Sequence, residues 1–289
     1  MTEPATRNLH TGKPASGPRD AAGLPELHFV HANSYPSATY RRFFAHLGEH
    51  YSVQSLPLHA HDPRYPVTNG WPHLVQELLD DLVARYDAPV ILAGHSMGGM
   101  LGLMAATARP DLVRCVVLLD SPVVAGWRAL LLRVAKAAGL DRRFGPARLS
   151  EKRRNVWPDA AAAHAHYAGK SLFSAWAPAV LDDYLEVGLA PHPHGVTLRF
   201  TREAETAVYR TLPHHLGRLV RRFPVPVGFI GGASSAECRQ AGLAATRRLV
   251  GRHFRLVPGG HLFPMESPGV AANAVHQMIA GLLPGGSDA

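Results

Sequence analysis

The chain of 289 residues is long enough for one domain with a large insertion or for two domains, and its 46% hydrophobic and 18% charged residues are typical of a globular protein. Its two cysteines, Cys115 and Cys238, lack paired-ligand spacing, which excludes a Cys-based zinc site and a disulfide framework and favours a reducing, cytoplasmic location. Lys and Arg total 30 against 22 Asp and Glu, a net charge of +8.

The first elements follow a tail that we expect to be disordered. Residues 1–23 contain several Pro and Gly but few apolar residues, and no apolar segment typical of a secretory signal peptide. Apolar runs then predict strands at residues 27–31 and 51–56, and helical spacing predicts helices at residues 40–50 and 71–86.

Residues 90–108 contain no Asp, Glu, Lys or Arg, and this run is just long enough to cross a bilayer. Its central glycines break it into a buried strand at residues 90–93 and a helix at residues 97–108, so we expect no membrane span. The turn between them matches Gly-x-Ser-x-Gly, which places Ser96 at the end of the strand as a candidate nucleophile. A glycine-rich turn without chemistry is the alternative interpretation.

A further strand at residues 115–119 closes on Asp120, and the alternation of strands and helices then stops. Residues 121–215 contain helical stretches interrupted by prolines, which predicts a helical cap inserted after the end of a strand and lying over Ser96. Much of the positive charge lies in residues 128–154, without the aromatic pattern of a nucleic-acid module. We interpret it as a solvated helical face and expect no nucleic-acid partner, with attraction of an anionic substrate, a membrane surface or a nucleic acid as the alternative.

Residues 216–289 return to the alternation of strands and helices. They predict strands at residues 225–230 and 253–257 and helices at residues 236–250 and 271–283. Together with residues 24–120, this predicts an α/β core with a mostly parallel sheet between two layers of helices. The carboxyl ends of all its strands then share one edge of the sheet.

A serine nucleophile needs a base, and the stretch "VPGGHLFPMESP" supplies His261. His261 follows the last predicted strand and therefore lies at the same edge as Ser96. A surface histidine without a catalytic role is the alternative.

Residues 24–283 resemble the α/β-hydrolase superfamily through "HANSYPSATYRRFF", "GHSMGG", "LLDSP" and "GGHLFPMESP", in that order. The resemblance implies a capped serine hydrolase that needs no metal and no organic cofactor. It also implies that the backbone N–H groups of Asn33 and Met97 form an oxyanion hole. The strand hairpin with which the family usually opens is missing or reduced here.

The acid of the triad is open between two residues. The family usually places it three residues beyond the second Gly of "VGFIGG", where this chain has Ser235, which carries no charge. Asp120 closes an apolar strand at the same edge, whereas Glu237 is expected to open a helix, where an acid needs no catalytic reason. We favour Asp120.

These residues predict hydrolysis of an ester or related carbonyl compound through an acyl-enzyme formed on Ser96. An acyltransferase, a lactone hydrolase or a carbon-carbon bond hydrolase would use the same triad, and a non-catalytic ligand-binding protein is a further alternative. Trp127, Trp176 and Tyr184 are candidate walls of a pocket for a small acyl or aromatic substrate, or alternatively core residues of the cap. The sequence names neither the substrate nor the oligomeric state.

Overall fold

The computed structural model describes residues 23–140 and 145–283. The predicted disorder of residues 1–23 concerns a segment that, apart from Gly23, lies outside the described residues. None of the helices within the described ranges combines the length and the hydropathy that a membrane crossing requires. The apolar run at residues 90–108 is divided at Ser96 into a strand and a helix, as the sequence predicts.

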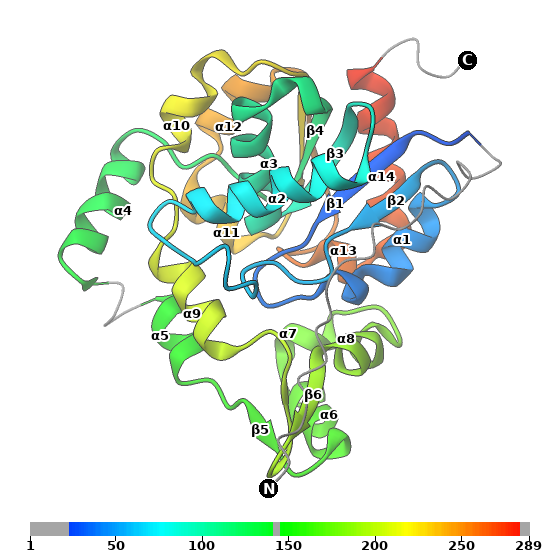
Figure 1. Ribbon diagram of the computed structural model, residues 1–289, viewed down its shortest axis with the longest axis vertical. Helices are drawn as coiled ribbons and strands as arrows, with labels where there is room; N and C mark the ends of the chain where they lie inside the picture. Colours follow the sequence, from blue (N-terminus) through cyan, green and yellow to red (C-terminus); the bar gives the residue numbers. More distant parts are fainter. Residues whose placement is uncertain (1–22, 141–144, 284–289) are drawn as a thin grey trace, which may run out of the picture.

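A six-stranded sheet forms the centre of the molecule (Figure 1). Its order is β2-β1-β3-β4-β8-β9, and every neighbouring pair is parallel, which confirms the predicted sheet. The central strands β3 and β8 are buried at every residue, which explains their uninterrupted apolar sequences. The strands are β1 (Glu26–Val30), β2 (Ser52–Ser55), β3 (Val90–His95), β4 (Val113–Leu119), β8 (Val227–Gly232) and β9 (Phe254–Val257).

Helices cover both faces of the sheet, and each layer has its own hydrophobic cluster. One layer contains α1 (Arg41–Leu47), α13 (Phe263–Glu266) and α14 (Pro268–Leu282). The other contains α2 (Pro72–Arg85), α3 (Met97–Ala108), α10 (Leu216–Leu219), α11 (Ala236–Ala241) and α12 (Ala244–Val250). Short 3-10 turns occur at η1 (Ser37–Tyr40), η2 (Pro110–Leu112) and η4 (Val220–Arg222).

The helix predicted at residues 236–250 is divided in the structure. Helix α11 ends at Ala241, and Gly242 follows with a φ of +73°, a conformation that side chains with a Cβ rarely adopt. Helix α12 then begins at Ala244. The helical periodicity continued through this glycine, so that the break was not visible in the pattern of apolar residues.

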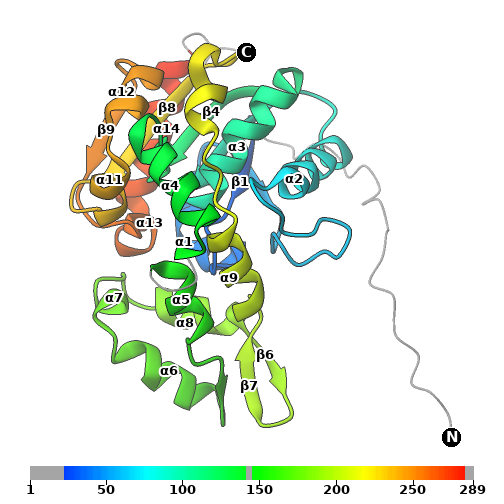
Figure 2. The ribbon, with the colours of Figure 1, turned by 90° about the vertical axis from the view of Figure 1, so that its left-hand side faces the viewer.

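The segment between β4 and β8, residues 121–226, is called the insertion below. Figures 1 and 2 both show most of it at one end of the molecule, and Figure 1 shows α4 along the side. The predicted cap of residues 121–215 falls within it, and those domain boundaries remain a prediction. Besides α10, which packs against α3, its helices are α4 (Trp127–Ala137), α5 (Pro146–Glu151), α6 (Ala160–Ala168), α7 (Ser171–Ser174), α8 (Val180–Gly188) and α9 (Arg202–Arg210).

The insertion is not purely helical, in contrast to the prediction. It contains an antiparallel sheet of β5 (Val156–Trp157), β7 (Gly195–Leu198) and β6 (Leu189–His192), in that order. Pro191, which indicated a break in the sequence, lies on β6 at the edge of this sheet, where the lack of an N–H is tolerated. Gly195 has a φ of +121°, and a Cβ there would lie 2.2 Å from the carbonyl oxygen of Trp157.

Helix α4 presents an apolar face to solvent. Trp127 is 65% exposed, and Leu130, Leu131 and Val134 follow on the same face, each more than half exposed. The other side of the helix is held to the core, because Lys136 Nζ donates hydrogen bonds to Asn69 Oδ1 (2.5 Å) and to the carbonyl oxygen of Leu212 (2.6 Å).

Candidate active site

Ser96 occupies the sharp turn between β3 and α3. Its φ of 53° and ψ of −114° lie outside the ordinary regions for a residue with a side chain, as in the strained turn of a nucleophile elbow. A Cβ on Gly94 would lie 2.4 Å from the carbonyl carbon of Gly98, and a Cβ on Gly98 would lie 2.0 Å from the carbonyl oxygen of Val30. Both glycines of the motif are therefore required, because α3 packs so closely against strands β3 and β1 that a Cβ at either position would clash.

Hydrogen bonds from the next strand hold this turn in place. The N–H of Ser96 donates to the carbonyl oxygen of Leu119 on β4 (2.9 Å), and the hydroxyl of Ser121 donates to the carbonyl oxygen of Ser96 (2.6 Å). A Cβ at Gly99 would lie 2.2 Å from Ser121 Oγ, so this third glycine makes room for the supporting hydroxyl.

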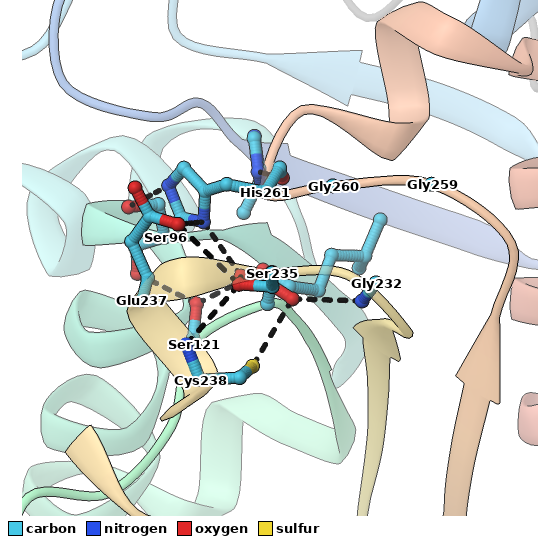
Figure 3. Close-up of polar contacts among 12 residues, drawn as sticks. Ser96, Ser121, Gly232, Ser235, Glu237, Cys238, Gly259, Gly260 and His261 are labelled. Carbon is cyan, nitrogen blue, oxygen red and sulfur yellow. Dashed lines mark hydrogen bonds and ion pairs between the residues drawn. The ribbon is translucent and has the colours of Figure 1, made fainter. Parts of the chain in front are cut away.

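His261 reaches Ser96 from the loop after β9 (Figure 3). Its Nε2 lies 3.1 Å from Ser96 Oγ, and its side chain is 20% exposed. The preceding N–H of Gly260 donates to the Glu266 carboxylate on α13 (2.9 Å), and the carbonyl oxygen of Gly260 touches Gly232, where a Cβ would be 2.0 Å away. The loop that carries the imidazole is thus fixed from two sides.

Asp120 lies on the other side of the imidazole. Its Oδ2 is 2.6 Å from His261 Nδ1, and its backbone adopts a φ of +43°, a conformation that Asp tolerates better than most residues. Burial would raise the pKa of Asp120, but the hydrogen bonds and charge of His261, Ser235 and Gly232 outweigh this and keep the pKa below its ordinary value. The carboxylate therefore stays ionised and favours the tautomer with a proton on Nδ1, in which Nε2 is the unprotonated nitrogen that faces Ser96 Oγ.

Glu237 is less well placed than Asp120. Its Oε2 lies 3.9 Å from His261 Nδ1, and its side chain is 51% exposed in the first turn of α11, where the sequence predicted a helix start. The geometry thus favours the acid that the sequence analysis preferred. Ligand atoms of Asp120, Glu237 and His261 lie within 4.8 Å of one another, a spacing that a metal ion would fit. Any such ion would compete with the proton shared by Asp120 and Nδ1.

Ser235 has a role that the sequence analysis missed. It stands where the family usually has the acid, and its hydroxyl donates to Asp120 Oδ2 at 2.6 Å (Figure 3). Asp120 Oδ1 accepts the N–H of Gly232 (2.8 Å) and the thiol of Cys238 (3.2 Å), whose pKa burial raises to about 12. The sequence did contain a signal for this role, namely a serine at the position where the family usually has its acid. A small hydrogen-bond donor at that position can support a carboxylate that comes from the end of the preceding strand, here Asp120.

A second chain of hydrogen bonds, also missed from the sequence, runs beneath the site. The hydroxyl of Tyr40 accepts the N–H of Ala32 (3.2 Å) and donates to His95 Nδ1 (2.7 Å), and His95 Nε2–H donates to the carbonyl oxygen of His261 (2.8 Å). Burial, with the nearby His261, lowers the pKa of His95 to about 3, so this imidazole is neutral. The chain connects the loop of Asn33, the turn of Ser96 and the loop of the base.

The two predicted oxyanion residues, Asn33 and Met97, are both buried. Asn33 follows β1, and Met97 is the first residue of α3, where a helix leaves its N–H groups without partners. Within the described residues, neither N–H donates to a protein acceptor. The side chain of Asn33 is anchored instead, because its Nδ2 donates to the carbonyl oxygen of Glu205 (3.3 Å).

The three predicted pocket residues lie in two different places. Trp176 and Tyr184 are buried, and their rings lie 5.9 Å and 5.7 Å from that of Tyr35, which follows Asn33 closely in the chain. Trp127 lies on the solvent face of α4 beneath the Arg128 guanidinium (4.5 Å), so the structure does not bring it to the site. The sequence of α4 has an amphipathic pattern with an apolar face that includes Trp127, and in the structure this face is exposed to solvent.

Comparison with known proteins places this geometry in a family. Lipase LipV of Mycobacterium tuberculosis is 28% identical over 204 residues, which cover 67% of this chain and 69% of that protein. The structure of E-2-(acetamidomethylene)succinate hydrolase has a TM-score of 0.72 at 24% identity, with 88% of this chain and 91% of that chain covered. A Mycobacterium tuberculosis esterase has a TM-score of 0.67 at 20% identity, covering 89% and 85%. Both structures show the shared fold, and the alpha/beta hydrolase family model matches residues 29–274, so the chain belongs to the alpha/beta hydrolase family.

Proposed function

We propose that the protein is a serine hydrolase that cleaves an ester or a related carbonyl substrate through an acyl-enzyme. The observation that carries the proposal is the line of hydrogen bonds from Ser96 Oγ through His261 to Asp120, with distances of 3.1 Å and 2.6 Å. The family and its lipase and esterase members support hydrolysis as the reaction class.

In the proposed reaction, Ser96 Oγ forms a bond to the substrate carbonyl carbon while His261 Nε2 takes the hydroxyl proton. The N–H groups of Asn33 and Met97 would stabilise the negative oxygen of the tetrahedral intermediate, and Asp120 the imidazolium. Nε2 then returns the proton to the leaving oxygen as its bond to carbon breaks. Water attacks the acyl-enzyme with the same base, releases the acid and restores the hydroxyl of Ser96.

The proposal is tested with a fluorophosphonate probe and a panel of 4-nitrophenyl esters of increasing acyl length. Wild-type protein should be labelled and should hydrolyse at least one ester, whereas Ser96→Ala should lose labelling and turnover, with a reduction in kcat on the order of 10⁶-fold. Ser171→Ala removes an exposed hydroxyl of α7 and serves as the matched control.

Labelling of Ser96→Ala at the wild-type rate would refute the assignment of the nucleophile. A folded wild-type protein that is neither labelled nor active would favour the non-catalytic, ligand-binding alternative. Transfer of the acyl group to an added alcohol in preference to water would identify an acyltransferase instead.

A further inference from the structure

Arg153 lies in the insertion, just after α5, and is paired with Glu205 on α9. Its Nη1 is 3.1 Å from Glu205 Oε1, and the two side chains are 20% and 6% exposed. The contact is single, because Glu205 Oε2 is buried without a hydrogen-bond partner. The pair therefore uses only part of the bonding capacity of each group.

The rest of the guanidinium is turned inward. Nε and Nη2 of Arg153 are both buried and lack a hydrogen-bond partner of acceptable geometry, although the phenol of Tyr184 lies beside the group. Nε and Nη2 form one edge of the guanidinium plane, and such an edge binds both oxygens of a carboxylate. Buried donors that remain unpaired are unfavourable, so this edge is suited to an acceptor that the protein does not itself supply.

Glu205 connects the guanidinium with a residue of the proposed oxyanion hole. The carbonyl oxygen of Glu205 accepts Nδ2 of Asn33 (3.3 Å), the residue proposed for the oxyanion hole. Glu205 therefore contacts the guanidinium through its carboxylate and Asn33 through its carbonyl oxygen.

Apart from the Glu205 carboxylate, aromatic side chains surround the guanidinium. Tyr35, Trp176 and Tyr184 form mutual ring contacts of 5.7 to 5.9 Å, and the pKa of each phenol is raised, chiefly by burial. The phenols thus stay protonated and uncharged. An apolar chain that ends in an anion would suit these groups, because the rings would contact the chain and the cation would bind its end.

We propose that Arg153 binds a carboxylate of the substrate, so that the enzyme prefers half esters of dicarboxylic acids over neutral esters. The inference rests on the proposed hydrolase function and specifies its substrate class. The net charge of +8 favours the approach of such an anion.

The test compares mono-4-nitrophenyl adipate with its methyl ester, which has nearly the same shape but no charge, and repeats the comparison with glutarate and suberate. Wild-type kcat/KM should favour the charged ester at least 10-fold for one of the three chain lengths. Arg153→Met should remove this preference and change kcat/KM for the methyl ester less than 3-fold. Arg154→Met alters the exposed neighbouring arginine and should leave the preference unchanged.

Glu205→Gln and the double variant Arg153→Met, Glu205→Gln separate recognition from folding, since the double variant leaves no buried carboxylate without its cation. Glu205→Gln should keep or increase the preference, and the double variant should lack it while still hydrolysing the methyl ester. Equal activity of wild type on charged and neutral esters, or equal losses on both in Arg153→Met, would show that the ion pair serves only the structure. Activity on neither ester would instead refute the proposed hydrolase function.

Discussion

The carboxyl edge of the sheet and the insertion differ in how their buried polar groups are paired. At the edge, Asp120 accepts hydrogen bonds from side chains and backbone on three elements, and His95 uses both ring nitrogens. In the insertion, individual buried donor or acceptor atoms lack a hydrogen-bond partner among the described residues in Arg153, Trp157, Tyr167, Trp176, Glu205, Arg210 and His214. Beside the edge, Asn33 Oδ1 and Ser34 Oγ are also unpaired, so the contrast concerns the residues around His261.

This difference separates two tasks. A site that performs proton transfer gains from groups that are held in place before the substrate arrives. A surface that recognises a substrate gains from groups whose partners arrive with the substrate. We infer that the edge of the sheet determines the reaction and that the insertion determines which molecules undergo it.

The strongest test of the edge replaces the acid. Asp120→Asn keeps the size of the side chain and tolerates the positive φ, but it allows the wrong tautomer of His261 and leaves the imidazolium unopposed. We expect a loss of about 10⁴-fold in kcat, measured at saturating ester from pH 6 to 9.

Glu237→Gln is the matched control and should cost little activity, because its carboxylate is half exposed and 3.9 Å from Nδ1. The reverse result, an inactive Glu237→Gln and an active Asp120→Asn, would show that Glu237 on α11 is the acid of the triad. Near-normal rates in both variants would mean that His261 works without a carboxylate.

Acid should weaken the sheet through its buried histidines. Burial lowers the pKa of His28, His31 and His95 from 6.5 to about 3, so each is neutral in the folded protein and takes up a proton on unfolding below about pH 6.5. The unfolded chain binds more protons between these values, so the free energy of unfolding falls as the pH falls from 6.5 towards 3. Between pH 6.5 and 5, the loss is at most about 2 kcal/mol for each histidine.

Urea unfolding at pH 7, 6 and 5 measures the slope of the free energy of unfolding against pH. His28→Asn should make the slope shallower, because it removes one titrating group from β1, whereas His164→Gln on the outside of α6 should leave it unchanged. A slope that is identical in wild type and His28→Asn would show that this buried imidazole does not contribute.

A smaller effect is expected from the hydrogen-bonded chain beneath the site. Tyr40→Phe leaves the N–H of Ala32 and Nδ1 of His95 unpaired and so loosens the support of the His261 loop. We expect kcat to fall on the order of 10-fold with a smaller change in KM. Unfolding should become easier by about 1–3 kcal/mol.

Tyr51→Phe provides a matched control for that variant. Tyr51 is also buried, and its hydroxyl is paired with His276 Nδ1 at 3.1 Å on the same face of the sheet, away from the proposed catalytic residues. Loss of this hydroxyl should lower the free energy of unfolding but should not change kcat. Equal effects of both variants on kcat would mean that Tyr40 serves only the general packing of the core.

The sheet could be predicted because buried parallel strands leave uninterrupted apolar runs, and because Gly94, Ser96 and Gly98 form a spacing that few other structures require. The insertion resisted prediction because its signals conflict. Pro191 indicated a break but occupies an edge strand, and Trp127 marked an apolar face that points to solvent.

The sequence also left the acid open, since Asp120 and Glu237 both follow strands at the same edge and only distance separates them. Arg153 was one of many basic residues in residues 128–154, and no local pattern distinguished it. Its burial depends on α9, which contributes Glu205 from far along the chain. Such contacts between distant segments are not encoded in periodicity.

The order of the strands also has a consequence for the time course of folding. His261 is separated by 165 positions from Ser96 and by 141 from Asp120, and it reaches them only when β9 has joined β8 at the end of the sheet. Pairing over such a separation is slow compared with the formation of helices. In refolding, recovered turnover is therefore a late marker that reports the docking of the final strand, after most of the helical signal has returned.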